Sequence, residues 1–343
     1  MKTFYKSKYT KRVEKCRTRS VFDILSGRFY DPGMPRTYTR RFRVRSTDCD
    51  AAGHVNNAVY LRYLQEVAIE ASADAGYDPA WYDAHGAGWV IRRSRIDYLQ
   101  PLRYGDEIDV TTYVVDVRRV RSQRNYEIVR AQDHVMAARA ATDWVFIDRR
   151  AGTPARVPND APARFLPDGP ASDIERIADA PAPPDTPPPN AFHTTRRVYY
   201  YEIDEYQHVN NSVYLSYLEQ AAIDAGAALG FDIPQVIELG GAIVAHQHDI
   251  EYLRPAQYGD TLDIATWIGK IGRVSVLRHT TMRIQGELAI RAQTRWVWVD
   301  LKTRRPAAMP ATMREALASQ QVKPHSATPS LRSGHGCGGG RDA

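Results

Sequence analysis

The sequence lacks several features that would place it in a specialised class of protein. It has no run of apolar residues near the roughly 20 that a helix needs to span a bilayer, and residues 1–20 lack the apolar core of a secretory signal. Its three cysteines, Cys16, Cys49 and Cys337, are scattered, which argues against a disulfide framework and a cysteine-based metal site. We therefore expect a soluble cytoplasmic protein with no membrane span, no metal and no cofactor of its own.

Acidic charge is also in deficit, because 46 Lys and Arg outnumber 40 Asp and Glu and give a net charge of +6. Much of the excess precedes the first motif, and a basic arm of this kind can bind nucleic acid or an anionic membrane surface. A solvated tail is the simpler interpretation, and we expect no nucleic-acid partner. Because Met34 stands just before the first strand pattern, residues 1–36 are predicted to lie outside the fold, with residues 1–33 as an over-extended gene start.

The rest of the chain contains two copies of one pattern. Equivalent residues lie 154 positions apart over most of each copy, and the offset slips by two only near the end, where Trp144 matches Trp296. A period of about 150 residues marks two whole domains rather than a solenoid. The pairs related by the constant offset include Asp50 and Asp204, His54 and His208, Asn57 and Asn211, and Gly76 and Gly230.

Each copy predicts the same order of secondary structure. A strand and a polar loop are followed by a helix with apolar residues at helical spacing, from Val59 to Ala71 and from Val213 to Ala225. One long helix followed by an antiparallel sheet, without βαβ alternation, predicts an α+β fold. Before the loop, a strand is predicted at Phe42 and Val44 in the first copy and at Val198 and Tyr200 in the second. After the helix of the first copy, strands are predicted at residues 89–98, 108–114, 122–132 and 136–148. After the helix of the second copy, they are predicted at residues 262–268, 275–285 and 288–300.

Composition predicts the boundaries between these copies. Proline is dense before residue 190, which predicts an extended, semi-rigid linker. Short helices are predicted at residues 173–180 and 312–320. The glycine-rich end is predicted to be disordered, with His335 and Cys337 in that tail rather than in a metal site. The predicted parts are a basic segment (1–36), a first domain (37–158), the linker (159–191), a second domain (192–310) and a C-terminal tail (311–343).

The motif between strand and helix resembles that of the hotdog-fold thioesterases, of the 4-hydroxybenzoyl-CoA and acyl-ACP thioesterase types. The resemblance covers about residues 38–158 and 193–310. It implies two tandem hotdog domains, each a long helix wrapped by a curved antiparallel sheet, paired as an intramolecular pseudo-dimer with active sites at the interface. The residues that carry it are Asp50-x-x-x-His54-Val-Asn56-Asn57-x-x-Tyr60 and Tyr98-Leu99-x-Pro101, repeated as Asp204-x-x-x-His208-Val-Asn210-Asn211-x-x-Tyr214 and Tyr252-Leu253-x-Pro255.

Thioester hydrolysis needs an attacking group and a donor that stabilises the oxyanion, and the motif offers both. Asp50 and Asp204 could act as general base or nucleophile, as the matching aspartate does in the thioesterases that this chain resembles. The alternative is a loop or helix-capping carboxylate. Asn57 and Asn211 are predicted to open the helices, where free N–H groups and the helix dipole can polarise the carbonyl. One such donor can contribute about 3 kcal/mol of transition-state stabilisation.

Further residues complete the predicted sites. By the resemblance to acyl-ACP thioesterases, His54 and His208 belong to them and could orient the carboxylate or the water. The phosphates of coenzyme A need cations. The residues predicted to bind them are Arg118 and Arg119, between two strands, and Lys270 and Arg273 in the second copy, with an exposed hairpin as the alternative. A second basic cluster, Arg92, Arg93 and Arg95, has no assigned role.

The two copies differ beside the carboxylate. Ala52 and Gly53 of the first copy become Tyr206 and Gln207 in the second. The bulk of Tyr206 predicts unequal sites, with the first one more open. Acyl-ACP thioesterases carry an asparagine two residues after the aspartate, where this chain has Ala52 or Tyr206, and this difference favours the CoA type.

Together these features predict a thioesterase of lipid metabolism whose substrate is an acyl-CoA or an acyl-ACP. Two alternatives stay open. A hotdog dehydratase uses an Asp…His pair at a different spacing, and a non-catalytic acyl-CoA-binding regulator can have the same fold. Retention of both motif copies in one chain favours the enzyme. Association of such chains into a homo-oligomer also stays open.

Overall fold

The computed structural model describes residues 36–167, 169, 174 and 176–321, together with the backbone of residues 21–23 and 28–30. Strands β1 (Val21–Asp23) and β2 (Arg28–Tyr30) pair with each other in a separate two-stranded sheet. The predictions for the remainder of residues 1–35, including Cys16, and for the glycine-rich tail with His335 and Cys337 concern residues outside this description.

A single antiparallel sheet runs through both sequence copies. The strands of the first copy occupy one half of the sheet and those of the second copy the other half, and the two central strands, β4 and β10, pair with each other. In order across the sheet, the strands are β3 (Thr37–Arg43), β5 (Glu107–Val117), β6 (Arg121–Arg130), β7 (Val135–Asp148), β4 (Ala87–Tyr98), β10 (Gly241–Tyr252), β13 (Glu287–Asp300), β12 (Ser275–Ile284), β11 (Thr261–Ile271) and β9 (Phe192–Arg197), with β8 (Thr153–Pro154) and β14 (Arg305–Pro306) beside β7 and β13.

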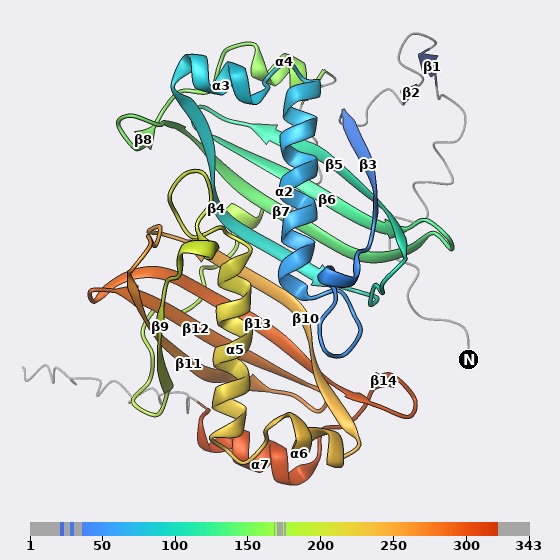
Figure 1. Ribbon diagram of the computed structural model, residues 1–343, viewed down its shortest axis with the longest axis vertical. Coiled ribbons are helices and arrows are strands. Elements are labelled where there is room, and N and C mark those ends of the chain that lie inside the picture. The colour runs from blue at the N-terminus through green and yellow to red at the C-terminus, as the bar shows by residue number, and fades with distance from the viewer. Residues whose placement is uncertain are drawn as a thin grey trace, which may run out of the picture.

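One long helix from each copy lies on the same face of this sheet (Figure 1). These are α2 (Asn57–Asp74) and α5 (Val213–Ala227). The α+β class and the paired tandem hotdog domains predicted from the sequence are therefore confirmed. Shorter elements lie at the ends of the two units: α3 (Pro79–His85), α4 (Ala161–Phe165), α6 (Ile233–Glu238), α7 (Ala311–Ser319) and the 3-10 helices η1 (Ser46–Asp48), η2 (Ile177–Asp179) and η3 (Tyr200–Glu202).

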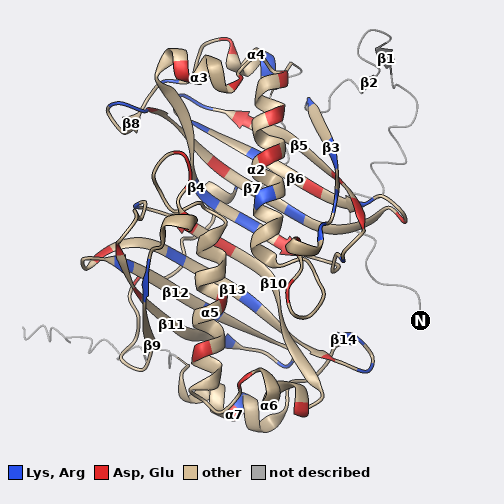
Figure 2. Cartoon of the chain, viewed as in Figure 1, with Lys and Arg blue, Asp and Glu red and all other residues tan. Residues whose placement is uncertain are grey.

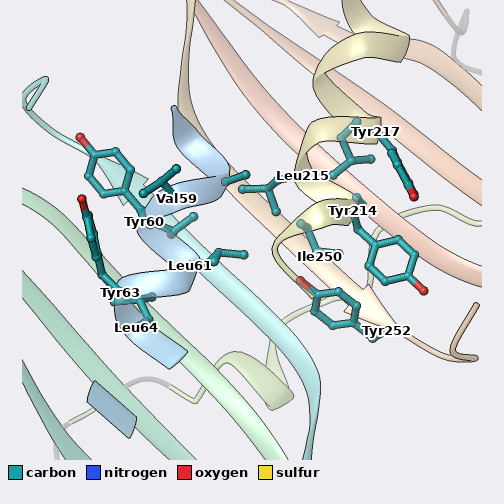
Figure 3. Close-up of a cluster of buried hydrophobic side chains, with 14 of the residues drawn as sticks. Val59, Tyr60, Leu61, Tyr63, Leu64, Tyr214, Leu215, Tyr217, Ile250 and Tyr252 are labelled. Carbon is teal, nitrogen blue, oxygen red and sulfur yellow. The ribbon is translucent and has the colours of Figure 1, made fainter. Parts of the chain in front are cut away.

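The apolar pattern of the two helices explains their burial. Val67 and Leu215 are 0% exposed, and residues from both helices belong to one hydrophobic cluster that also contains Ile250 of β10 (Figure 3). Complete burial of a side chain such as Leu218 contributes roughly 2 kcal/mol to folding. Alanines at Ala68 and Ala221 leave little side-chain volume between helix and sheet. The two units thus share one core.

Buried charge reinforces the seam between β4 and β10. The carboxylate of Asp249 is fully buried and bonds the guanidinium groups of Arg93 at 2.7 Å and Arg95 at 2.9 Å. Arg92 pairs with Glu251 at 3.2 Å across the same seam. The arginine cluster that had no assigned role in the sequence therefore holds the two units together.

The structure corrects the predicted domain boundaries. Phe165 of α4, assigned to the linker, is buried in the core of the first unit, and Met313 of α7, assigned to the tail, is buried in the second. The helix predicted at 312–320 is confirmed as α7. Within the described part of the linker, the helix predicted at 173–180 is only the 3-10 turn η2, whose Ile177 is buried.

The strand predicted around Val198 and Tyr200 ends earlier than expected, at Arg197. The carboxylate of Glu202 accepts a hydrogen bond from the N–H of Tyr199 at 2.8 Å and turns the chain into η3. Asp48 does the same for Arg45 in the first unit, also at 2.8 Å. Both motif loops therefore leave the sheet through the same kind of turn.

Charged side chains of both signs are interspersed over the two units (Figure 2). Within the described ranges, no helix is both long and apolar enough to cross a membrane.

Candidate functional site

The first motif forms a closed loop around its carboxylate. Cys49 and Val55 bridge the base of the loop, and the N–H of Asp50 donates to the carbonyl of His54 at 2.8 Å. Oδ1 of Asp50 accepts the N–H of Ala52 at 2.9 Å. Gly53 has a φ of 73°, in the left-handed region that glycine adopts without a steric penalty. The loop therefore presents an exposed Asp50 in a fixed position.

The second motif repeats this loop with a different residue at the turn. Asp204 donates its N–H to the carbonyl of His208 at 2.9 Å, and its Oδ1 accepts from Tyr206 at 2.9 Å. Gln207 takes the place of Gly53 and has a φ of 63°. A left-handed conformation costs a non-glycine residue about 1 kcal/mol, so the second loop keeps this shape at an energetic cost.

The two carboxylates differ in burial. Asp50 is exposed, whereas Asp204 is half-buried. Burial raises the pKa of Asp204 above its ordinary 3.8, against the hydrogen bonds from Tyr206 and His208 that lower it. The ring of Tyr206 lies beneath the guanidinium of Arg149 from the first unit, 5.0 Å from its centroid. The loops are thus unequal in the direction predicted from Tyr206.

Both helix starts carry the same cap. Asn56 is the N-cap of α2, its side chain accepting the N–H of Ala58 at 2.9 Å, so that Asn57 is the first helical residue. In the second unit the side chain of Asn210 accepts the N–H of Ser212 at 2.9 Å in the same way, and it also bonds the hydroxyl of Ser212 at 2.7 Å. Regular α-helix begins at Val213, two residues later than predicted from Asn211, although the capping hydrogen bond is the equivalent one.

A carboxylate of the second unit faces the start of α2. Asn57 donates a hydrogen bond from Nδ2 to Oε1 of Glu219, on α5, at 2.5 Å. Nε2 of His248 lies 3.8 Å from the same oxygen, and the His248 side chain is fully buried. Nδ1 of His248 is 2.9 Å from the hydroxyl of Thr294. We call the group of Asp50, His54, Asn57, Glu219 and His248 the first centre.

The second centre has neutral groups at the equivalent positions. Gln65 of α2 corresponds to Glu219, and its Oε1 accepts from Asn210 at 3.1 Å. Ser94 corresponds to His248. A small cavity of about 10 Å³ lies here between α2, the sheet and the start of α5; its lining includes Leu61, Gln65, Ser94, Tyr126, Trp144 and Asn211. With Asp204 and His208, these residues form the second centre.

Glu219 and His248 are the candidate site residues that sequence reasoning missed. Both lie outside the repeated motif, and both reach the first centre from the opposite unit. A signal was present: the 154-residue offset pairs Glu219 with Gln65 and His248 with Ser94, a charged and a titratable residue against two neutral ones. Such differences mark positions where the two copies have diverged.

The histidines of the motif lie beside their carboxylates. The backbone N–H of His54 donates to Oδ1 of Asp50 at 3.4 Å, and burial, reinforced by Arg103, lowers the pKa of the His54 imidazole. Its Nε2 is buried and has no hydrogen-bond partner among the residues that the structure describes. This neutral imidazole is available to accept or donate a proton.

The predicted phosphate-binding residues lie at the β5–β6 and β11–β12 hairpins. Arg118 follows β5 and is bonded to Asp116 at 3.0 Å, whereas Arg119 is exposed. Lys270 lies within β11, near its end, and Arg273 lies in the hairpin after it; both are exposed. The ion pair of Arg118 does not join it to either centre, and the role of all four residues in binding coenzyme A stays a prediction.

A larger cavity, of about 420 Å³, lies between α5 and β9, apart from the residues that define the two centres. Its lining includes Thr194 and Arg196, where the first unit has Arg40 and Phe42. Phe42 packs on Tyr63 at 5.1 Å in that unit. Replacement of the phenylalanine and the arginine explains why this cavity appears beside α5.

In the described part of the chain, no three His, Cys, Asp or Glu residues are grouped to hold a metal ion.

Comparison with known proteins agrees with this architecture. The Long-chain acyl-CoA thioesterase FadM of Escherichia coli is 33% identical over 134 residues, which are 38% of this chain and 100% of the relative. The chloroplastic acyl-acyl carrier protein thioesterase ATL3 of Arabidopsis thaliana is 25% identical over 156 residues, 45% of this chain and 78% of the relative.

The fold is also found among solved structures. The 12:0-ACP thioesterase from Umbellularia californica superposes with a TM-score of 0.63 at 15% identity, over 76% of this chain and 94% of that one. Residues 44–165 and 198–317 each match the family described as the Thioesterase-like superfamily. These two matches cover more than half of the chain and coincide with its two structural units, and the chain therefore belongs to the Thioesterase-like superfamily.

Proposed function

We propose that the protein hydrolyses the thioester of an acyl-CoA or an acyl-ACP to the free acid and the thiol. The observation that carries this proposal is the start of α2, where Asn57 meets the carboxylate of Glu219. An N–H group at a helix start and a carboxylate side by side are the two elements that water addition to a carbonyl requires. The relatives named for acyl-CoA and acyl-ACP substrates support both thioesters equally.

The chemistry follows from these positions. The carbonyl oxygen of the thioester accepts the N–H of Asn57, where the helix dipole stabilises the developing negative charge. A carboxylate takes a proton from water as the water oxygen bonds to the carbonyl carbon. The C–S bond then breaks, and the proton returns to the departing thiolate. Asp50 and Glu219 are the two carboxylates available for this role at the first centre, with direct attack by Asp50 as the alternative.

The first centre is the productive one in this proposal. It combines Asp50, which is exposed, with Glu219 from the facing unit. The second centre has Asp204, and the neutral Gln65 takes the position that Glu219 has in the first. A site with one partly buried carboxylate has fewer groups for the same reaction.

Thiol release from a panel of acyl-CoA and acyl-ACP thioesters tests the proposal. We expect turnover with at least one class, a loss of at least about 100-fold in Asp50→Asn, and a smaller loss in Asp204→Asn. Equal losses in the two variants would contradict the assignment of the first centre. Tight binding of acyl-CoA without hydrolysis of any thioester would overturn the enzyme and favour an acyl-CoA-binding regulator.

A further inference from the structure

Each unit supplies a wall of side chains to the centre that faces it, and the two walls differ in their hydrogen bonds. In the first unit the hydroxyl of Thr142 lies 3.0 Å from the hydroxyl of Tyr126 and accepts the indole N–H of Trp144 at 2.6 Å. Each of these polar atoms is thereby satisfied within the unit. Tyr126 and Trp144 line the small cavity of the second centre together with Leu61 and Ile91. This wall presents mainly carbon to a bound acyl group.

The equivalent wall of the second unit is rearranged. Thr280 takes the position of Tyr126, and its hydroxyl lies 2.9 Å from that of Thr266. The hydroxyl of Thr294, which corresponds to Thr142, is 2.9 Å from Nδ1 of His248. The indole of Trp296, which corresponds to Trp144, therefore loses the hydroxyl that its counterpart bonds. Two substitutions, Ser94 to His248 and Tyr126 to Thr280, account for the change.

This arrangement leaves two buried nitrogen atoms without a hydrogen-bond partner among the described residues. They are Nε1 of Trp296 and Nε2 of His248. His248 is 0% exposed. A buried polar group without a partner costs about 1–3 kcal/mol, and a ligand that supplies the missing bond removes this cost.

Both atoms lie close to the first centre. The rings of His248 and Trp296 have centroids 6.0 Å apart. Nε2 of His248 is 3.8 Å from Glu219, which bonds Asn57 at the helix start. A substituent that contacts His248 therefore lies next to Glu219, the carboxylate beside the reacting carbonyl. It belongs to the part of the acyl group near the thioester.

We propose that the first centre selects acyl groups that carry a hydroxyl near the thioester, and that Nε2 of His248 and the indole N–H of Trp296 bind this hydroxyl. This proposal rests on the thioesterase function proposed above. A hydroxyl both donates and accepts, so it can accept the N–H of Trp296 and complement either tautomer of His248. A ketone oxygen only accepts, and a methylene leaves both atoms unpaired.

The second centre offers a different set of polar atoms. Its wall holds Tyr126 and Ile91 where the second unit has Thr280 and Ala245. The indole N–H of Trp144 is already bonded to Thr142, and Oγ of Ser94 is the buried atom of this wall without a hydrogen-bond partner among the described residues. The pair of an imidazole nitrogen and an open indole N–H is therefore present in the first centre and not in the second.

The test compares 3-hydroxyacyl-CoA with 3-oxoacyl-CoA and unsubstituted acyl-CoA of the same chain length. We expect kcat/KM for the hydroxyacyl substrate to exceed that for the unsubstituted one by at least about tenfold. Trp296→Phe and His248→Ser, which copies Ser94, each reduce this ratio. Trp89→Phe, which removes an indole N–H bonded to Tyr82 outside both centres, is the control and leaves the ratio unchanged.

A ratio near one in the wild type, or an equal loss with all substrates in Trp296→Phe, would overturn the proposal. Equal preference for the oxo and hydroxy compounds would show that a simple acceptor suffices and would remove the argument for a hydroxyl. Calorimetry with non-hydrolysable thioether analogues, with and without the hydroxyl, reports the same contact without turnover. A binding preference without any hydrolysis would then retain the hydroxyl site and reject the thioesterase function.

Discussion

The substitution Glu219→Gln gives the first centre the kind of side chain that the second centre has at this position. Glutamine is close to glutamate in size and keeps Oε1, so the hydrogen bond from Asn57 Nδ2 can still form. The change removes the negative charge and with it the ability to take a proton from water. The structure therefore separates the effect on folding from the effect on catalysis.

The expected magnitudes differ accordingly. A hydrogen bond to a charged group contributes about 1.5–3 kcal/mol and a neutral one about 0.5–1.5 kcal/mol. We expect Glu219→Gln to reduce the free energy of unfolding by about 1 kcal/mol. General-base catalysis contributes 10²- to 10⁴-fold, so kcat should fall at least about 100-fold, which corresponds to about 2.7 kcal/mol of activation free energy.

The assay combines thiol release under saturating and limiting substrate with urea unfolding of the same variant. Gln65→Glu is the matched control, because it adds a carboxylate at the equivalent position of the second centre and leaves the first intact. A Glu219→Gln protein that folds with nearly wild-type stability and keeps its kcat within about threefold would refute the reasoning. In that case Asp50 would carry the reaction without Glu219.

Two further predictions concern stability. Asp249→Asn removes the carboxylate that bonds the buried Arg93 and the partly buried Arg95 at the β4–β10 seam, so urea unfolding should show a loss of about 3–5 kcal/mol. The exposed Asp185→Asn is the control and should cost less than about 1 kcal/mol. Similar losses in the two variants would contradict the role of the seam. Because burial raises the folded-state pKa of Asp204, its contribution is fully present below the unfolded pKa and is lost as pH rises through the folded pKa. We therefore expect Asp204→Asn to raise the urea midpoint at about pH 7 and the gain to vanish near pH 3; an unchanged midpoint at pH 7 would show that burial does not penalise this carboxylate.

Much of the fold follows from local sequence patterns. The apolar spacing from Val59 to Ala71 predicts α2, and alternating residues predict most strands of the sheet, because both patterns depend on neighbours within a few positions. The constant offset of 154 predicts two equivalent units. The hotdog resemblance at the motif then predicts their pairing, which β4 and β10 confirm.

The boundaries were harder to predict because they depend on packing. Nothing local distinguishes Phe165 or Met313 from a linker or tail residue. Each is buried because it packs on apolar side chains of its unit that lie far away in the sequence. Arg93 similarly reads as a surface cation, and the position of Asp249, 156 residues away, makes it a buried ion pair.

The sequence by itself determined the duplication, the two helices and the loop that holds Asp50 and Asp204, because these features depend on short-range spacing and backbone hydrogen bonds. Only the tertiary structure decided which groups face those loops. Glu219 meets Asn57 across 162 residues of chain, and His248 lies 3.8 Å from Glu219 on the strand that pairs with the first unit. The units share one motif, but each centre takes its facing wall from the other unit, and the divergence of these walls makes the two centres unequal.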